Sequence, residues 1–275
     1  MTIKLIAIDI DGTLLNSNKN LTKATIEAIE AASKAGIHVC ISSGRPLTEC
    51  LEYTRQMPSM RYIVTCTGAQ VIDMQTGRDI FRNPLSADEL RMLYGIITQY
   101  GAIPDIFDEE NHIHNRATDM EITEIWGSLY KDVKLTHIPE DDLDTYVANY
   151  TGVTNKIHMF FHDLSKKPAL WKELEKLPYE IMESDFDDLE IMPRGIDKGL
   201  GLQKLAEHLG LEASQVMALG DGGNDVGMFQ YAGTAIAMKN ASQFAKAAAD
   251  RISDYTNDED GVAHEIRALL KGEPT

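Results

Sequence analysis

Basic residues, long apolar runs and paired cysteines are all scarce in this chain of 275 residues. The 26 lysines and arginines are outnumbered by 43 aspartates and glutamates, which gives a net charge of -17. Nucleic-acid binding relies on basic side chains that neutralise phosphates, so this balance argues against a nucleic-acid partner. An anionic substrate would need a locally positive pocket made of a few basic groups, backbone amides or a metal ion.

The apolar runs are too short for a membrane anchor or a secretion signal. The first run stops at Asp9, and no stretch approaches the roughly 18 apolar residues of a spanning helix. Cys40, Cys50 and Cys66 show no CxxC spacing and lie in apolar or helical stretches, so we expect buried free thiols in a reducing compartment. The sequence thus predicts a cytoplasmic protein with no membrane partner.

What is present is ordinary globular composition. Hydrophobic residues make up 43% of the chain and charged residues 25%, which excludes general disorder. The length suits one large domain or two modest ones, each with its own core. No pattern in the chain predicts an oligomeric state.

Strand and helix patterns alternate in the first third of the chain. Short apolar segments over 4–8, 37–41 and 62–65 predict buried strands, and amphipathic segments over 22–36 and 47–57 predict helices. This order, with brief loops, favours a parallel sheet with helices on its faces.

The same alternation returns at the end of the chain. Strands are predicted over 216–219 and 234–237, and helices over 198–208, 225–231, 242–249 and 262–270. The two ends therefore predict two halves of one sheet in an α/β fold.

The pattern changes between these two ends. Ser86 and Glu89 form a capping-box pattern that opens a helix to Tyr100. Short alternating strands follow over 103–107, 111–115 and 156–161. We expect an α+β domain at residues 84–190, inserted into a core of residues 1–83 and 191–275. Without a matching metal-ligand pattern, the histidines of this region are expected at the surface: His112, His114, His158 and His162.

Two carboxylates follow the first predicted strand, in LIAIDIDGTLL (5–15). On an extended segment Asp9 and Asp11 point the same way, toward the crevice where open α/β sheets bind ligands. One could act as a nucleophile or metal ligand while the other exchanges a proton with a leaving group. A simple turn explains a bare DxDG equally well. An EF-hand loop is excluded because Gly12 is fourth rather than sixth and Asn20 occupies position twelve.

Other predicted strands also end in polar residues. CISSGRP (40–46) offers a serine hydroxyl and a glycine amide suited to a phosphate oxygen, although it is also a common strand-to-helix loop. MALGDGGND (217–225) presents Asp221 at the strand end and Asn224 and Asp225 at the next helix, where a turn and a helix cap are the alternative. Carboxylates gathered from neighbouring strands would suit Mg²⁺.

A lysine is expected at an unfavourable place. GIDKG (195–199) puts Lys198 at the start of a predicted helix, where the helix dipole disfavours a cation unless an anion meets it. A lone lysine is usually a solvated surface charge, but the other polar motifs in the chain favour a functional role for Lys198.

These four motifs, in this order, resemble those of the haloacid dehalogenase-like (HAD) phosphohydrolases, in the Cof-type sugar-phosphate phosphatase branch. The motifs are DIDGT (9–13), SGR (43–45), IDKG (196–199) and GDGGND (220–225), and AGTAIAMKNA (232–241) and DEDGVA (258–263) extend the likeness to the end of the chain. The resemblance implies a Rossmann-like core with a mostly parallel sheet and an inserted cap.

The resemblance also implies roles for individual residues. It makes Asp9 the nucleophile and Asp11 the general acid and base. The implied phosphate contacts are Ser43, Gly44, Lys198 and Asn224, and the implied Mg²⁺ site comprises Asp9, Asp11, Asp221 and Asp225. The substrate would be a small phosphorylated metabolite, hydrolysed through an aspartyl-phosphate.

Two alternatives to this function stay open at the level of the sequence. A phosphosugar mutase could use the same core, and a noncatalytic sensor could bind a phosphorylated ligand in the same pocket, although a sensor would not need Asp11. One residue departs from the family pattern: Thr67 stands where relatives often have asparagine. That difference does not touch the expected catalytic set.

Overall fold

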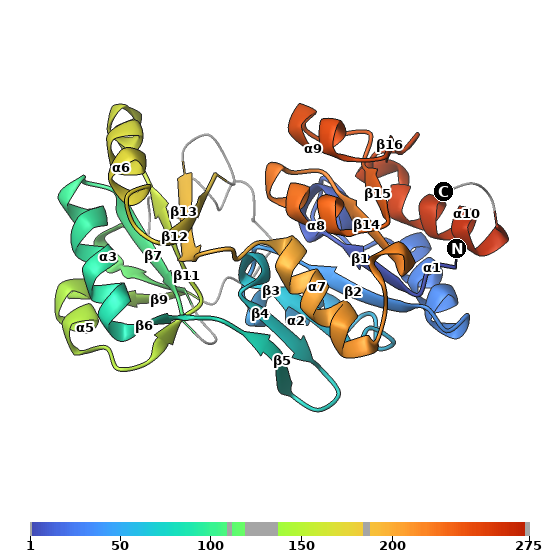
Figure 1. The fold of residues 1–275 in the computed structure, drawn as a ribbon, viewed down its shortest axis with the longest axis horizontal. Helices are drawn as coiled ribbons and strands as arrows, with labels where there is room; N and C mark the ends of the chain where they lie inside the picture. Colours follow the sequence, from blue (N-terminus) through green and yellow to red (C-terminus); the bar gives the residue numbers. More distant parts are fainter. Residues whose placement is uncertain (1, 109–111, 119–136, 184–187, 273–275) are drawn as a thin grey trace. The chain divides into compact units, whose positions relative to one another are not determined.

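The computed structural model describes residues 2–108, 112–118, 137–183 and 188–272. The chain divides into two compact units, which Figure 1 shows. The first unit joins Met1–Arg82 to Asp197–Thr275, and the second comprises Asn83–Ile196. Two distant parts of the sequence therefore build one unit.

The first unit contains an eight-stranded sheet. Its strand order is β16-β15-β14-β1-β2-β3-β4-β5, with β4 and β5 antiparallel and the other neighbours parallel. Because β1 lies between β2 and β14, the two ends of the sequence do form one mostly parallel sheet, as expected. The strands are β1 (Leu5–Ile8), β2 (His38–Ser42), β3 (Tyr62–Thr65), β4 (Gln70–Asp73), β5 (Arg78–Arg82), β14 (Val216–Gly220), β15 (Thr234–Ala237) and β16 (Arg251–Ile252).

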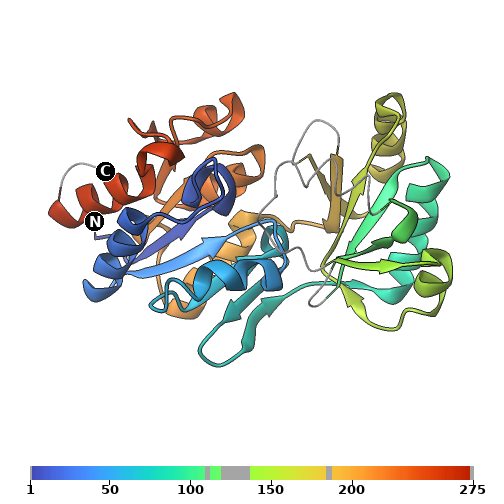
Figure 2. The ribbon, with the colours of Figure 1, turned by 180° about the vertical axis from the view of Figure 1, so that it is seen from behind.

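Helices cover both faces of this sheet. Helix α7 packs against α8 on the near side in Figure 1, and Figure 2 shows α1 and α2 on the other side, where α1 packs against α10. The helices are α1 (Lys23–Lys34), α2 (Leu47–Thr54), α7 (Lys198–Leu209), α8 (Val226–Tyr231), α9 (Gln243–Ala248) and α10 (Gly261–Lys271). Short turns complete the unit: η1 (Ile10–Leu14), η2 (Cys66–Gly68), η4 (Ala213–Gln215), η5 (Gly223–Asp225) and η6 (Asn257–Glu259).

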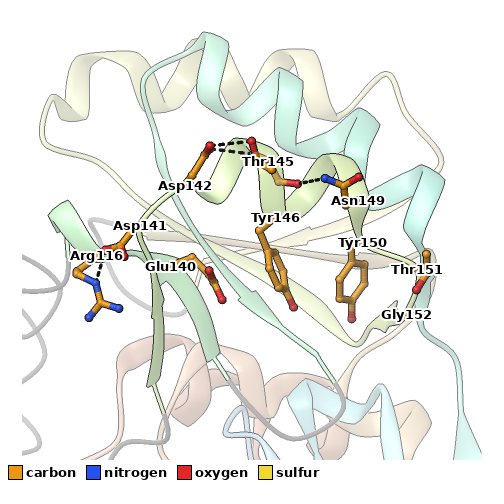
Figure 3. A pocket seen from close by; sticks show the side chains of 10 residues that line it. All are labelled: Arg116, Glu140, Asp141, Asp142, Thr145, Tyr146, Asn149, Tyr150, Thr151 and Gly152. Carbon is orange, nitrogen blue, oxygen red and sulfur yellow. Dashed lines mark hydrogen bonds and ion pairs between the residues drawn. The ribbon is translucent and has the colours of Figure 1, made fainter.

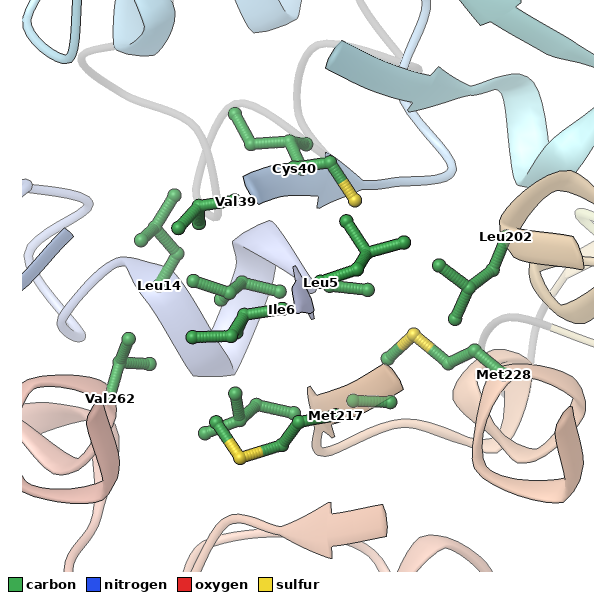
Figure 4. Close-up of a cluster of buried hydrophobic side chains, with 14 of the residues drawn as sticks. Leu5, Ile6, Leu14, Val39, Cys40, Leu202, Met217, Met228 and Val262 are labelled. Atoms are coloured by element: carbon green, nitrogen blue, oxygen red, sulfur yellow. The ribbon is translucent and has the colours of Figure 1, made fainter. Parts of the chain in front are cut away.

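The core of the first unit is centred on β1 and its two neighbours. Figure 4 shows Leu5 and Ile6 of β1 among side chains from β2, β14 and the surrounding helices. Covered on both faces, a central parallel strand reads as a continuous apolar run, and all four residues of β1 are buried. Cys40, Cys50 and Cys66 are buried thiols, as predicted.

The second unit contains a six-stranded sheet and a separate two-stranded pair. The larger sheet has the order β12-β13-β11-β7-β8-β9, and β10 pairs with β6. The strands are β6 (Leu85–Ser86), β7 (Ile103–Phe107), β8 (His112–Asn115), β9 (His137–Glu140), β10 (Val153–Thr154), β11 (Lys156–Phe160), β12 (Tyr179–Met182) and β13 (Asp188–Pro193). The helical segments are α3 (Ala87–Gln99), α5 (Leu143–Asn149), α6 (Lys167–Leu174) and η3 (Leu164–Lys166). The capping box of Ser86 and Glu89 is present at the start of α3.

One face of the six-stranded sheet supports an apolar core of its own. Ile157 and Ile191 pack with Leu93 of α3 and with leucines of α6. The second unit therefore has its own hydrophobic cluster, as an independently packed domain requires. None of the helices in the described ranges is long and apolar enough to cross a bilayer.

The expectation that the histidines of this unit lie at the surface is wrong for three of the four. His112, His114 and His158 are buried, and only His162 is exposed. The ring of His112 lies 2.9 Å from Asp105, and that of His158 lies 2.8 Å from Asp188. A buried histidine costs free energy unless its ring is hydrogen-bonded, and these carboxylates provide that bond. Because they come from other strands, the pairing could not be predicted from the local sequence.

Candidate active site

Asp9 leaves β1 at the edge where the parallel strands end. Its backbone N–H donates to the carbonyl of Leu219 on β14, at 3.0 Å, and the turn η1 follows at once. The carbonyl of Asp9 accepts from Leu14, at 3.0 Å, which folds the turn back on the strand end. These backbone contacts hold Asp9 at the end of β1, beside β14, with its side chain buried.

Gly12 makes this turn possible. Its backbone is left-handed, with φ of +76°, and a Cβ at this position would lie 2.1 Å from Oδ2 of Asp221. The neighbouring Thr13 donates its hydroxyl to Oδ1 of Asp221, at 3.1 Å. The turn after β1 therefore packs directly on the carboxylate that follows β14.

Replacing Gly12 by alanine is expected to damage the site more than the fold. Gly36→Ala is a matched control, because Gly36 is also left-handed, with φ of +81°, but has open space around its Cβ position. Both variants should lose about 1–2 kcal/mol to backbone strain. Only Gly12→Ala must also displace Asp221, so its kcat should fall about 10²-fold further. Thermal unfolding and turnover assays of both variants would check this, and equal kcat values would contradict it.

Three carboxylates gather next to this turn. Oxygens of Asp9, Asp221 and Asp225 lie within 4.8 Å of one another. Asp9 and Asp225 are buried and Asp221 is partly buried. They meet because β1 and β14 are parallel neighbours whose carboxyl ends share one edge of the sheet.

Lys198 is the counter-charge inside this cluster. It begins α7 and is fully buried, and its Nζ lies 2.6 Å from Oδ1 of Asp9 and 2.5 Å from Oδ1 of Asp225. A longer contact of 3.4 Å reaches Oδ1 of Asn224. Burial favours the neutral amine, but Asp225 and Asp9 raise the pKa of Lys198 above its ordinary value. The ammonium is therefore held charged, at the helix start where only nearby anions make a cation favourable.

One ammonium does not balance three carboxylates. Burial raises the pKa of Asp9 well above its usual value; Lys198 opposes this shift, while Asp225 and Asp221 add to it. The pKa of Asp221 rises to about 7, first through burial and then through Asp225. A divalent cation would relieve this excess of negative charge, and carboxylate oxygens are the donors that Mg²⁺ takes.

The carboxylates are not equally suited to such a cation. Asp225 accepts from Lys198 with one oxygen and from the backbone N–H groups of Asp221 and Gly222, at 2.8 and 2.9 Å, with the other. Asp9 and Asp221 each have one oxygen engaged, by Lys198 and Thr13 respectively. The residues present fit a cation held mainly by Asp9 and Asp221, with Asp225 bracing Lys198 and the Asp221 loop.

Asp11 is not one of these three carboxylates, and it is bound by two basic side chains. Arg45 binds it with two parallel hydrogen bonds, Nε to Oδ2 at 2.8 Å and Nη2 to Oδ1 at 2.9 Å, and Nζ of Lys19 lies 2.9 Å from Oδ1. Burial opposes ionisation, but Arg45 and Lys19 together hold the pKa of Asp11 at about 2. Asp11 is thus an ionised carboxylate in this arrangement, and both of its oxygens are engaged.

Ser43 and Gly44 directly follow β2, the other neighbour of β1. Ser43 is buried, and its Oγ accepts from the backbone N–H of Arg45 at 3.2 Å. Of the other two predicted phosphate contacts, Lys198 and Asn224 lie in direct contact with each other. The structure places Ser43 and Gly44 at the adjacent strand end.

Three residues of the site went unassigned at the level of the sequence: Thr13, Lys19 and Arg45. Arg45 and Thr13 lie inside recognised motifs, which could have drawn attention to them. Lys19 is marked only by its surroundings, since it lies in an asparagine-rich turn. Its own backbone is left-handed, with φ of +58°, and the side chain of Asn16 accepts from the N–H groups on either side of it.

The unusual Thr67 lies in the turn that braces Lys198. Its φ is +56°, a left-handed conformation that asparagine adopts more readily than a β-branched residue. At the adjacent Gly68 a Cβ would lie only 1.9 Å from the carbonyl oxygen of Asp197. The turn η2 therefore presses on the start of α7, where Lys198 is.

A cavity of about 820 Å³ lies elsewhere, in the second unit. Figure 3 shows Tyr146 and Tyr150 of this cavity side by side, with Arg116 bonded to Asp141. Its lining includes none of the predicted site residues. The cluster of Asp9, Asp221 and Asp225 belongs to the first unit instead.

Comparison with known proteins agrees with the motifs. A family model for haloacid dehalogenase-like hydrolases matches residues 6–266. The 5-amino-6-(5-phospho-D-ribitylamino)uracil phosphatase YcsE of Bacillus subtilis is 32% identical over 266 residues, which cover 96% of this chain and 95% of that protein. The putative phosphatase YxeH of the same organism is 29% identical, with 97% and 98% covered.

Solved structures share the fold. A haloacid dehalogenase-like hydrolase from Bacteroides thetaiotaomicron has a TM-score of 0.84 at 28% identity, with 98% of this chain and 100% of that chain covered. A sugar phosphatase of HAD subclass IIB has a TM-score of 0.82 at 22% identity, with 97% and 99% covered, and supports the fold alone. The chain therefore belongs to the haloacid dehalogenase-like hydrolase family and is a phosphatase that hydrolyses phosphoric monoesters.

Proposed function

We propose that this phosphatase depends on Mg²⁺ and hydrolyses the phosphates of small sugars or sugar alcohols through an aspartyl-phosphate. The observation that carries the proposal is the buried Lys198 ammonium between Asp9 and Asp225, with the Asp221 carboxylate in the same cluster. Such a site is short of positive charge until a cation binds.

Asp9 and Asp221 would hold the metal ion, and Asp225 would keep both Lys198 and the Asp221 loop in place. A bound Mg²⁺ supplies positive charge that stabilises the transferring phosphoryl group. We assign Asp11 no direct metal contact in the described arrangement, because Arg45 and Lys19 engage both of its oxygens.

Asp9 is proposed as the nucleophile. An ionised carboxylate needs no base to attack phosphorus, but its approach to a phosphate dianion is repulsive. Lys198 offsets that repulsion because its ammonium is already 2.6 Å from Asp9. Asn224, together with Ser43 and Gly44 after β2, is proposed to contact the phosphoryl oxygens.

Asp11 is proposed as the general acid and base. It would protonate the departing alkoxide and then take a proton from the water that hydrolyses the aspartyl-phosphate. An ionised Asp11 carboxylate, which Arg45 and Lys19 favour, suits the second step. Donation in the first step requires the Asp11 carboxyl group to leave Arg45 and Lys19.

The second unit is proposed as the cap that selects the leaving group, with residues 84–190 as the inserted segment expected from the sequence. Support comes from its separate hydrophobic core, which allows it to vary without disturbing the catalytic sheet. A relative named as a 5-amino-6-(5-phospho-D-ribitylamino)uracil phosphatase suggests a polyhydroxylated leaving group. Buried thiols further favour the cytoplasm as the place of action.

A panel of phosphorylated metabolites tests this proposal directly. Sugar and sugar-alcohol phosphates should release inorganic phosphate with Mg²⁺ and not after treatment with EDTA, and added Mg²⁺ should restore the rate. Full activity in EDTA would refute the metal dependence. An isomeric sugar phosphate without free phosphate would instead identify the phosphosugar mutase.

A further inference from the structure

The loop after β15, residues 238–242, contacts both of the turns that carry the site's carboxylates. Met238 donates its backbone N–H to the carbonyl of Gly220 at 2.9 Å, and Ser242 donates to the carbonyl of Asp221 at 2.8 Å. From the same loop, Nδ2 of Asn240 donates to the carbonyl of Gly12 at 2.8 Å. The loop thus holds the Asp221 turn through its backbone and the Asp9–Asp11 turn through one side chain.

The Asn240 side chain is itself held in one orientation. Its Oδ1 accepts from the backbone N–H of Asn257 at 3.0 Å, so its amide nitrogen must face Gly12. Asn257 in turn donates its own Nδ2 to the carbonyl of Leu15 at 2.8 Å. Two asparagines from the C-terminal part of the chain therefore hold the middle and the C-terminal end of the turn that follows β1.

Gly12 lies between two anchors. Asn240 binds its carbonyl, and the Asp221 carboxylate fills the place where its Cβ would be. Because the peptide group is planar, fixing the Gly12 carbonyl also fixes the direction of the Thr13 N–H. Thr13 then donates its hydroxyl to Asp221. Any movement at Gly12 would change the distance between the two turns.

We propose that Asn240 is a positioning residue, which sets the separation between Asp9 and Asp221 and thereby the affinity of the site for a divalent cation. This inference rests on the proposed function, in which those two carboxylates hold Mg²⁺. Asn240 is exposed and touches none of the reacting groups, so its effect must pass through Gly12. Groups that orient metal ligands typically change metal affinity or activity by about 10- to 100-fold when they are removed.

Calorimetric titration of the metal-free protein with Mg²⁺, without substrate, tests the inference. Asn240→Ala and Asn240→Leu both remove the hydrogen bond, and leucine keeps the volume of the side chain. Both should bind Mg²⁺ about tenfold more weakly than wild type. Gln243→Ala, an exposed neutral amide three residues on, should bind like wild type. Melting temperatures of the metal-free variants would show that all four proteins fold.

The variants test the positioning role of Asn240, and the wild-type protein tests the proposed metal site. Wild-type affinity in Asn240→Ala, or recovery of affinity in Asn240→Leu, would overturn the positioning role. Equal weakening in Gln243→Ala would also overturn it, because the effect would then belong to the loop in general. Failure of the wild-type protein to bind Mg²⁺ would instead refute the proposed function.

Discussion

Asp9→Asn is expected to lower kcat by about 10⁴-fold or more on every phosphate ester. The neutral amide cannot form the proposed aspartyl-phosphate, and it also weakens the anionic cluster that would bind Mg²⁺. The fold should survive, because asparagine has nearly the same shape and the loss of one buried carboxylate reduces the excess of negative charge around Lys198. Single-turnover assays with several substrates would measure the loss.

Asp254→Asn is a suitable control for this variant. Asp254 is an exposed carboxylate of the same unit, and its replacement should leave kcat within about twofold, as for most surface positions. Asp11→Asn gives a second comparison. It should lose far more on alkyl phosphates than on p-nitrophenyl phosphate, whose leaving group departs without a proton. Substantial turnover by Asp9→Asn would mean that another group attacks phosphorus.

Lys198→Met is expected to affect stability and catalysis together. Removing the ammonium leaves Asp9 and Asp225 buried without their counter-charge, and breaking a buried pair in this way typically costs about 3–5 kcal/mol. The site would also lose the cation that offsets repulsion between Asp9 and the phosphate, so kcat should fall about 10³-fold. Urea unfolding and kinetics at saturating Mg²⁺ would measure the two losses.

Lys204→Met provides a matched control on the same helix. Lys204 is partly exposed and pairs with Glu207, so its replacement should change stability by no more than about 1 kcal/mol. The double variant Lys198→Met with Asp225→Asn should regain part of the stability, because one uncompensated carboxylate is gone, but none of the activity. Unchanged stability in Lys198→Met would show that the buried ion pair is not needed for the fold.

Local patterns were enough to predict most of the elements that build the first unit, although strands β4, β5 and β16 were not predicted. The continuous apolar run of β1 and the amphipathic spacing of α7 follow from burial on two faces and on one face, respectively. Local patterns also predicted strands in the second unit, but they did not predict which of the polar residues on those strands are buried. His158 could be recognised as buried only with Asp188 in view, thirty residues away on a paired strand.

The candidate site shows the same division. Motifs pointed to Asp9, Lys198 and Asp221 because each follows a strand or begins a helix. They did not reveal that Arg45 binds Asp11, since that contact depends on how the turns after β1 and β2 face each other. Nor did they show that Asn240 reaches Gly12, 228 residues away in sequence.

By itself, the sequence determined the alternation of strands and helices, the net negative charge and the kinds of side chain that follow the strands. Burial periodicity and backbone preferences act over a few residues, so they can be read locally. Only the tertiary structure decided the partners: Lys198 between Asp9 and Asp225, and Asp11 held by Arg45 and Lys19. Charges and hydrogen bonds act over a few ångströms of space, and distances in space are set by how the sheet brings its strand ends together.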